Sequence, residues 1–233
     1  MGKKIAIYDS GTIGACQATL TSGNGYSTVV IGHSEEGLSR CRNTMLQNWN
    51  DLIAQKLATA ANRRAAMDLV TITNDVSALR DCDIVFEAVS EDVNIKQRVY
   101  SIITEVCGRD IIVVSTTSSI DAAILAEKIE NPARFLIAHP FQPVHMLPLV
   151  EVVRHTETSE ETLNQVCTLL KDLNRQVVML NRSVPGFLVN RFAQALFRES
   201  IYLIEQGITT AADIDRAIKY AVGMRYASIG LLE

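Results

Sequence analysis

A histidine and a glutamate lie on two consecutive apolar runs in the second half of this 233-residue sequence. His139 follows the run Arg134–Ala138, and Glu151 lies within the next run, Leu149–Val153. An imidazole can remove the proton of an alcohol, and a neighbouring carboxylate would hold the ring tautomer and stabilise its cationic form. The pair therefore predicts a general base, His139, supported by Glu151. A structural histidine and a buried structural acid are the alternatives.

A glycine-rich turn directly follows the first apolar run of the chain, Lys3–Tyr8. Residues 9–14 read D-S-G-T-I-G where a dinucleotide-binding fold has G-x-G-x-x-G. The second and third glycines of that pattern would let backbone amides approach a pyrophosphate and let the next helix pack closely on the strand. A plain tight turn is the alternative. The pattern predicts cofactor contacts from Gly11, Thr12, Ile13 and Gly14.

Two positions depart from the dinucleotide-binding pattern. The first glycine is replaced by Asp9, a carboxylate close to where phosphates would lie. The second apolar run, Ser27–Ile31, is followed by Gly32 and His33 instead of the acid that binds the adenosine ribose hydroxyls. NAD is the predicted cofactor. Because a glycine followed by a histidine could accept a 2′-phosphate, NADP is the alternative. Gly32 and His33 are predicted to contact the cofactor.

The candidate residues lie on or near apolar runs that alternate with helical segments. Continuous apolar strands alternating with helices are typical of a mostly parallel sheet with helices on both faces. The sequence therefore predicts an α/β fold of the Rossmann type. The expected strands are Lys3–Tyr8, Ser27–Ile31, Val70–Ile72, Cys82–Ala88, Asp110–Ser115, Arg134–Ala138, Leu149–Val153 and Gln176–Met179. The expected helices are Thr12–Thr21, Glu35–Met67, Asp92–Val106 and Glu160–Leu173.

A purely helical pattern replaces this alternation in the last part of the chain. Gly207 separates two expected helices, Gly186–Glu205 and Thr210–Val222. We therefore predict a nucleotide-binding domain over residues 1–183 and a small all-helical domain over residues 184–233.

Composition excludes several classes of protein. The net charge is −4 and no basic run is evident, so nucleic acid is not an expected partner. No apolar stretch reaches the roughly 20 residues of a membrane helix, and the start, Met1–Ile5, leads into a strand without a signal peptide. The five cysteines are scattered without a C-x-x-C pair, so neither disulfides nor a metal site is expected. Together these features indicate a cytoplasmic protein.

Four motifs follow one another between residues 114 and 191. They read V-S-T-T-S-S-I from Val114, A-H-P-F-Q-P from Ala138, P-L-V-E-V-V from Pro148 and V-P-G-F-L-V-N-R from Val184. In this order they resemble the L-3-hydroxyacyl-CoA dehydrogenase family, which includes 3-hydroxybutyryl-CoA dehydrogenases. Residues 223–230 are similar to its branch of gulonate 3-dehydrogenase (lambda-crystallin), carnitine dehydrogenase and diketoreductases. The resemblance covers nearly the whole chain and implies NAD(P)-dependent oxidation of a 3-hydroxyacyl-CoA in fatty acid metabolism.

The resemblance also implies a four-residue catalytic set. Ser118 matches the family serine that hydrogen-bonds the reacting oxygen, and Asn190 matches the asparagine that polarises the carbonyl. With His139 and Glu151 these residues would form the catalytic site. The alternatives are that Ser118 caps a helix beginning near Asp121, or that Asn190 makes only an interdomain hydrogen bond.

Further cofactor contacts are carried over from the family. Glu91 and Lys96 match positions near the nicotinamide ribose, and Ser118 and Gln142 are also expected to contact the cofactor. Gln142 and Thr116 stand where the family usually has asparagine, so the placement of nicotinamide or substrate can differ.

The resemblance leaves substrate and assembly open. The family usually forms homodimers through its C-terminal helices, and this chain is expected to contain only the N-terminal part of that helical domain. The helix around Trp49 lies where the family contacts CoA, so a CoA thioester is the first substrate class. A free 3-hydroxy acid or a diketo ester is the second. A non-enzymatic or cofactor-impaired homologue is the third possibility, favoured by Asp9.

Overall fold

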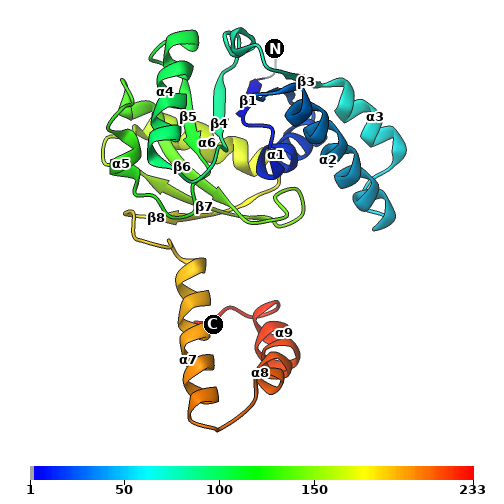
Figure 1. The fold of residues 1–233 in the computed structure, drawn as a ribbon, viewed down its shortest axis with the longest axis vertical. Helices are drawn as coiled ribbons and strands as arrows, with labels where there is room; N and C mark the ends of the chain where they lie inside the picture. Colours follow the sequence, from blue (N-terminus) through cyan, green and yellow to red (C-terminus); the bar gives the residue numbers. More distant parts are fainter. Residues whose placement is uncertain (1–2) are drawn as a thin grey trace. The chain divides into compact units, whose positions relative to one another are not determined.

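The computed structural model of the chain describes residues 3–233 (Figure 1). Met1 and Gly2 lie outside the described residues, and so does the first part of the segment for which no signal peptide was predicted. The chain divides into two compact units, Met1–Phe187 and Leu188–Glu233. This division falls four residues after the boundary predicted from the sequence, at 183/184.

The first unit is built on one eight-stranded sheet in the order β3-β2-β1-β4-β5-β6-β7-β8. Neighbouring strands are parallel except for β6 and β7, which are antiparallel. The predicted Rossmann-type, mostly parallel sheet is therefore confirmed. The strands are β1 Lys4–Tyr8, β2 Ser27–Ile31, β3 Val70–Thr73, β4 Ile84–Glu87, β5 Ile112–Ser115, β6 Phe135–Pro140, β7 Leu149–Arg154 and β8 Gln176–Leu180.

Helices cover both faces of the sheet because its strands are apolar on both sides. Along β1, Ile5 and Ile7 pack into one core and Ala6 and Tyr8 into the other. The first core is covered by α1 Thr12–Gly23, α2 Glu35–Ala54 and α6 Glu160–Asp172. The second core is covered by α4 Val93–Cys107 and the short α5 Ala122–Ala126. Short 3₁₀ turns lie at Val76–Leu79 and Pro132–Arg134.

The long helix predicted over Glu35–Met67 is wrong in one respect, because two helices occupy this stretch. Lys56 adopts φ +60° just after α2 ends, and this left-handed conformation cannot continue a right-handed helix. Thr59 then begins α3, Ala60–Asp68, with a reciprocal capping box to Asn62. At the other end, the predicted N-cap of α2 is confirmed, since Ser34 Oγ accepts a hydrogen bond from the Gly37 amide.

The second unit contains only helices among its residues 188–233. They are α7 Val189–Glu205, α8 Ala211–Ala217, a π-helical turn Ile218–Val222 and α9 Gly223–Tyr226. Gly207 follows α7 with φ +67°, which only glycine adopts without strain. Across residues 3–233, no helix is long and apolar enough to span a bilayer.

Candidate active site

His139 and Glu151 face each other where β6 and β7 pair in antiparallel fashion. The strand register places them directly opposite one another, and His139 Nδ1 lies 2.9 Å from Glu151 Oε2. Glu151 is fully buried and His139 is 7% exposed. Since an ionised carboxylate only accepts hydrogen bonds, Nδ1 carries the hydrogen and Nε2 of the neutral ring is left as an acceptor. This geometry suits a base that uses Nε2.

Two phenylalanine rings pack against the imidazole of His139. The ring centroid of Phe141 lies 4.7 Å away and that of Phe187 lies 5.6 Å away. Phe187 is 1% exposed, so the ring of His139 is held from two sides as well as by Glu151. Phe187 was not singled out from the sequence, although it directly follows Gly186 in one of the four motifs.

Ser118 lies in a turn directly after β5, which we call the 117–119 turn (Thr117, Ser118 and Ser119). Neither serine caps α5, because its N-cap is Asp121, which accepts from the Ala123 amide at 2.8 Å. The capping role considered for Ser118 is therefore wrong. The turn instead surrounds Glu91 Oε1. Its donors are Thr117 Oγ1 at 2.5 Å, Ser118 N at 3.0 Å, Ser118 Oγ at 3.3 Å, Ser119 N at 3.2 Å and Ser119 Oγ at 3.0 Å.

A buried ion pair lies beneath Glu91. Lys96 Nζ contacts Glu87 Oε1 at 2.8 Å, the Val89 carbonyl at 3.2 Å and Glu91 Oε2 at 3.4 Å. The side chains of Lys96 and Glu87 are 1% and 0% exposed. The other oxygen of Glu87 accepts from Tyr100 Oη and Ser115 Oγ, each at 2.8 Å. We call these residues the Glu87 network: Glu87, Lys96, Tyr100 and Ser115.

Burial, hydrogen bonds and charges in this region shift the pKa values of Glu91 and Tyr100. Burial would raise the pKa of the Glu91 carboxyl, but hydrogen bonds from the 117–119 turn and the Lys96 ammonium outweigh it, so that pKa lies below its usual value. Burial and the nearby Glu87 charge raise the pKa of Tyr100 well above its usual value. Glu87 itself was missed from the sequence, and the only signal for it was an acid ending an apolar strand.

The glycine turn after β1 packs tightly against its own backbone. A Cβ at Gly14 would lie 2.0 Å from the Asp9 carbonyl oxygen, so only glycine fits there. Asp9 adopts φ +136°, a conformation that suits glycine. Its carboxylate Oδ2 accepts a hydrogen bond from the Gly11 amide at 2.9 Å. In the dinucleotide-binding pattern, the backbone amides of this turn are the ones that approach the pyrophosphate.

A pocket of about 530 Å³ opens beside this turn, at the carboxyl ends of β1, β2 and β4. The sheet order reverses between β1 and β4, and such switch points are where open α/β sheets bind ligands. The pocket and the close approach at Gly14 fit a dinucleotide, with the carboxylate of Asp9 as the one opposing feature. The lining joins four residues singled out from the sequence to four that were not: Asp9, Thr12, Ile13 and His33, with Ala88, Val89, Ser90 and Ile95.

An Asp9→Gly variant is expected to bind NADH about fivefold more tightly, because it removes a negative charge beside the pyrophosphate worth roughly 1 kcal/mol at a partly exposed site. Titration of NADH fluorescence measures the change. Asp9→Asn is the matched variant, since it removes the charge but keeps the side-chain oxygen. Unchanged affinity in both would mean that the carboxylate turns away from the bound cofactor.

The other residues predicted from the sequence to contact cofactor or substrate make fewer contacts that bear on such a role. Gln142 is exposed and follows His139 by three residues. Gly32 approaches Ser10, whose Oγ would lie 2.6 Å from an added Cβ. Asn190 lies in the first turn of α7, within the second unit. The roles of these residues stay predictions. Across residues 3–233, no group of three or more His, Cys, Asp or Glu side chains is arranged to hold a metal.

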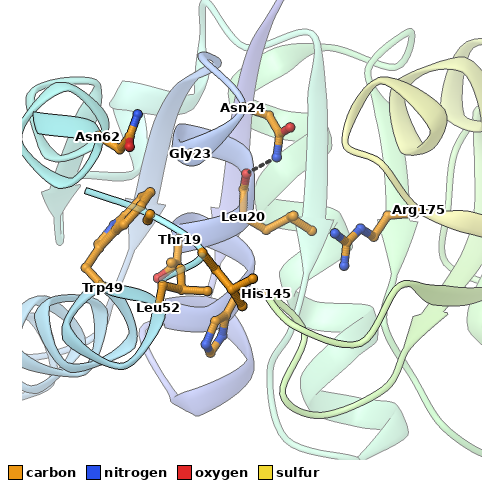
Figure 2. A pocket seen from close by; sticks show the side chains of 11 residues that line it. Thr19, Leu20, Gly23, Asn24, Trp49, Leu52, Asn62, His145 and Arg175 are labelled. Atoms are coloured by element: carbon orange, nitrogen blue, oxygen red, sulfur yellow. Dashed lines mark hydrogen bonds between the residues drawn. The ribbon is translucent and has the colours of Figure 1, made fainter. Parts of the chain in front are cut away.

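A second pocket, of about 250 Å³, lies where α1, α2 and the loop after β6 meet (Figure 2). Figure 2 shows Trp49 and His145 beside Thr19, and Arg175 beyond Leu20. Burial lowers the pKa of His145. Arg175, the residue before β8, donates to the carbonyls of Val144 and Leu147 in the loop after β6 at 3.2 and 2.9 Å. This pocket adjoins α2, the helix around Trp49 where a contact with CoA is expected.

Comparison with known protein families matches both parts of the chain. Residues 4–183 match the NAD-binding domain of 3-hydroxyacyl-CoA dehydrogenase. Residues 186–233 match the C-terminal domain of the same family.

Individual relatives are named for different substrates, among them a free hydroxy acid and CoA esters. The chain is 31% identical to the L-carnitine dehydrogenase of Bacillus cereus, over 98% of this chain and 69% of that protein. It is 30% identical to the 3-hydroxyadipyl-CoA dehydrogenase of Escherichia coli, over 98% of this chain and 48% of that protein. Among solved structures, the (S)-3-hydroxybutyryl-CoA dehydrogenase of Ralstonia eutropha superposes with a TM-score of 0.89 at 28% identity, over 95% of this chain and 78% of that one.

Proposed function

The chain belongs to the 3-hydroxyacyl-CoA dehydrogenase family, and from this premise we propose that it transfers a hydride between NAD and an L-3-hydroxyacyl-CoA. The observation that carries the proposal is the pair of His139 and Glu151, 2.9 Å apart where β6 meets β7. A base with a held tautomer is what oxidation of a secondary alcohol requires.

The chain's own residues would handle the proton of the reaction. In the oxidising direction, His139 Nε2 takes the hydroxyl proton, and the buried carboxylate of Glu151 stabilises the imidazolium that forms. When bound, NAD⁺ would accept the hydride that leaves the carbon bearing this hydroxyl group. Ser118 hydrogen-bonds the reacting oxygen, and Asn190 polarises the carbonyl in the reverse direction.

The cofactor residues proposed are those singled out in the sequence. Thr12, Ile13 and His33 line the pocket beside Asp9, which supports a role in cofactor binding. Since no acid follows β2, we expect discrimination between NADH and NADPH to stay below about 100-fold, or roughly 2.7 kcal/mol.

A free 3-hydroxy acid is the second candidate substrate. The similarity to L-carnitine dehydrogenases favours it, because three of these relatives are 30–32% identical to the chain, which covers 69–73% of each, against 48% of the 3-hydroxyadipyl-CoA dehydrogenase. The proton chemistry at His139 is the same for both substrate classes, so the difference lies in what holds the far end of the substrate.

One experiment tests the proposed function and separates these classes. Binding of NADH and NADPH is titrated first, and turnover of acetoacetyl-CoA is then compared with turnover of a free 3-oxo acid. Preferred reduction of acetoacetyl-CoA supports the first proposal, and preferred reduction of the free acid supports the second. Cofactor binding without turnover of any 3-oxo compound would leave a non-enzymatic homologue.

The second pocket offers a finer test of CoA binding. Leu52→Trp would fill part of the cavity that Leu52 lines. If CoA reaches this pocket, the KM for acetoacetyl-CoA rises by about tenfold, the order of one lost apolar contact. The KM for the free acid should not change. An equal change for both substrates would assign the effect to the fold rather than to CoA.

We also propose a homodimer formed through the helices of the second unit. None of the residues of α7, α8 and α9 is buried within the described chain. Along α7, Phe197, Ile201 and Ile204 recur at the i, i+4, i+7 spacing of one helix face and are 61%, 40% and 41% exposed. Such an apolar stripe favours association with another surface, and a symmetric pair is the commonest arrangement. Sedimentation at micromolar concentration should show a dimer, and a stable monomer would contradict it.

A further inference from the structure

The turn that ends the first unit joins a common turn sequence to an unusual backbone conformation. Residues 184–187 read V-P-G-F, and the Phe187 amide donates to the Val184 carbonyl at 3.0 Å. Proline at the second place and glycine at the third, with Gly186 at φ +75°, are typical of a type II turn. Phe187 itself then adopts φ +46°, which is unfavourable for a bulky side chain. Such a conformation persists only where the surrounding structure fixes it.

Packing of the Phe187 side chain supplies that constraint. The side chain is buried in the core that α4 and α5 cover. Its ring centroid lies 5.6 Å from that of the His139 imidazole, with the two planes tilted by 58°, a separation at which aromatic rings attract one another. Phe141 packs on the same imidazole at 4.7 Å but directly follows β6. Of the two phenylalanines, only Phe187 connects the imidazole to the chain that leaves the first unit.

The chain after Phe187 carries Asn190, the residue expected to polarise the carbonyl. Asn190 follows Phe187 by three residues and lies in the first turn of α7. Three residues span at most about 11 Å. However the two units are arranged, the Cα atom of Asn190 therefore stays within that distance of the Cα atom of Phe187. Since Phe187 is packed against the base, its burial also limits how far Asn190 can move from His139.

We propose that Phe187 is a positioning residue with two effects: its ring holds the imidazole of His139, and its burial anchors the chain that carries Asn190 so that both residues reach the same carbonyl. The inference rests on the proposed function, in which His139 handles the proton and Asn190 polarises the carbonyl. It goes beyond that function because Phe187 acts through these two residues and needs no contact of its own with substrate or cofactor.

Two double-mutant cycles test the anchor, with Phe141→Ala as the matched control for Phe187→Ala. In the parent, Asn190→Ala should lower kcat by about 100-fold, the order of one lost donor to a reacting oxygen. In Phe187→Ala the same change should cost no more than about fivefold, because Asn190 is no longer held and coupled residues are not additive. In Phe141→Ala it should still cost about 100-fold, because this ring is not linked to Asn190. Additive effects in both cycles would overturn the anchor.

A longer connection to α7 tests the same anchor without opening a cavity in the core. Two glycines inserted between Phe187 and Leu188 leave the ring in place and extend the reach of the chain by about 7 Å. The insertion should lower kcat about as much as Asn190→Ala does, and by no more than about threefold when Asn190 is already alanine. The same two glycines after Gly108, in the exposed loop between α4 and β5, should leave kcat within about twofold, since surface loops tolerate insertion. An insertion after Phe187 that has no effect would overturn the inference.

Amide hydrogen exchange provides a readout that needs no turnover. The amide of residue 187 donates to the Val184 carbonyl, and its protection should fall at least about tenfold in Phe187→Ala, because the turn loses the buried side chain that fixes it. In Phe141→Ala the protection should fall by no more than about threefold. Equal losses in the two variants would contradict the anchor. Loss of protection confined to Phe187→Ala, in a protein that binds NADH but reduces no 3-oxo compound, would support the anchor and reject the proposed function.

Discussion

A His139→Gln variant is expected to lose between about 100-fold and 10,000-fold in turnover, the usual contribution of a general base. Glutamine keeps a polar side chain between Phe141 and Phe187 but cannot accept the hydroxyl proton. NADH affinity should stay nearly intact, because the pocket beside Asp9 is lined by other residues. Steady-state kinetics with the preferred 3-oxo substrate and fluorescence titration of NADH give the two numbers.

Two further variants make this result specific. His155→Gln changes a histidine that hydrogen-bonds the Glu157 amide, and it should leave turnover within about twofold, as expected for a surface substitution. Glu151→Gln should lower turnover less than His139→Gln does, since it removes the carboxylate that holds Nδ1 but leaves the base in place. Equal turnover in His139→Gln and the parent would mean that the base lies elsewhere.

A Lys96→Met variant is expected to lose about 3–5 kcal/mol of the free energy of unfolding, because it leaves the buried charge of Glu87 without its ammonium partner. Glu87 is fully buried, so solvent cannot replace that partner. Urea unfolding followed by the fluorescence of Trp49, the single tryptophan of the chain, measures the loss. Trp49 is 4% exposed and lies in the first unit, so the signal reports the unit that contains Lys96.

Lys128→Met is the matched control, since Lys128 is exposed and its loss should change the free energy of unfolding by no more than about 0.5 kcal/mol. Adding Glu87→Gln to Lys96→Met should recover part of the stability by removing the unpaired charge. A loss below about 1 kcal/mol in Lys96→Met would show that the pair is not a buried structural element. The cofactor contact predicted for Lys96 from the sequence would then be the only role left for it.

Much of the fold could be predicted because its signals are local. Apolar runs bounded by turns marked the positions of all eight strands, and Ser34 marked the start of α2. The break in the helix over residues 35–67 was missed because Lys56 carries no turn signal in its residue type. The short α5 was considered only as the alternative of a helix near Asp121 and was not among the expected helices, since five residues are too few to show a helical period.

The sequence alone determined the residue types able to do chemistry and the strand ends that carry them. His139 and Glu151 were predicted to act together because consecutive strands place them within reach, and the antiparallel register joins them. Only the tertiary structure decided which polar groups share one environment. Glu87, Lys96 and Ser115 come from three separate elements and meet only when β4, β5 and α4 pack. Likewise, the Asp9 carboxylate turns onto the Gly11 amide through a backbone conformation that no residue type announces. Burial and hydrogen bonding across distant segments are properties of packing, and the linear pattern of residues does not contain them.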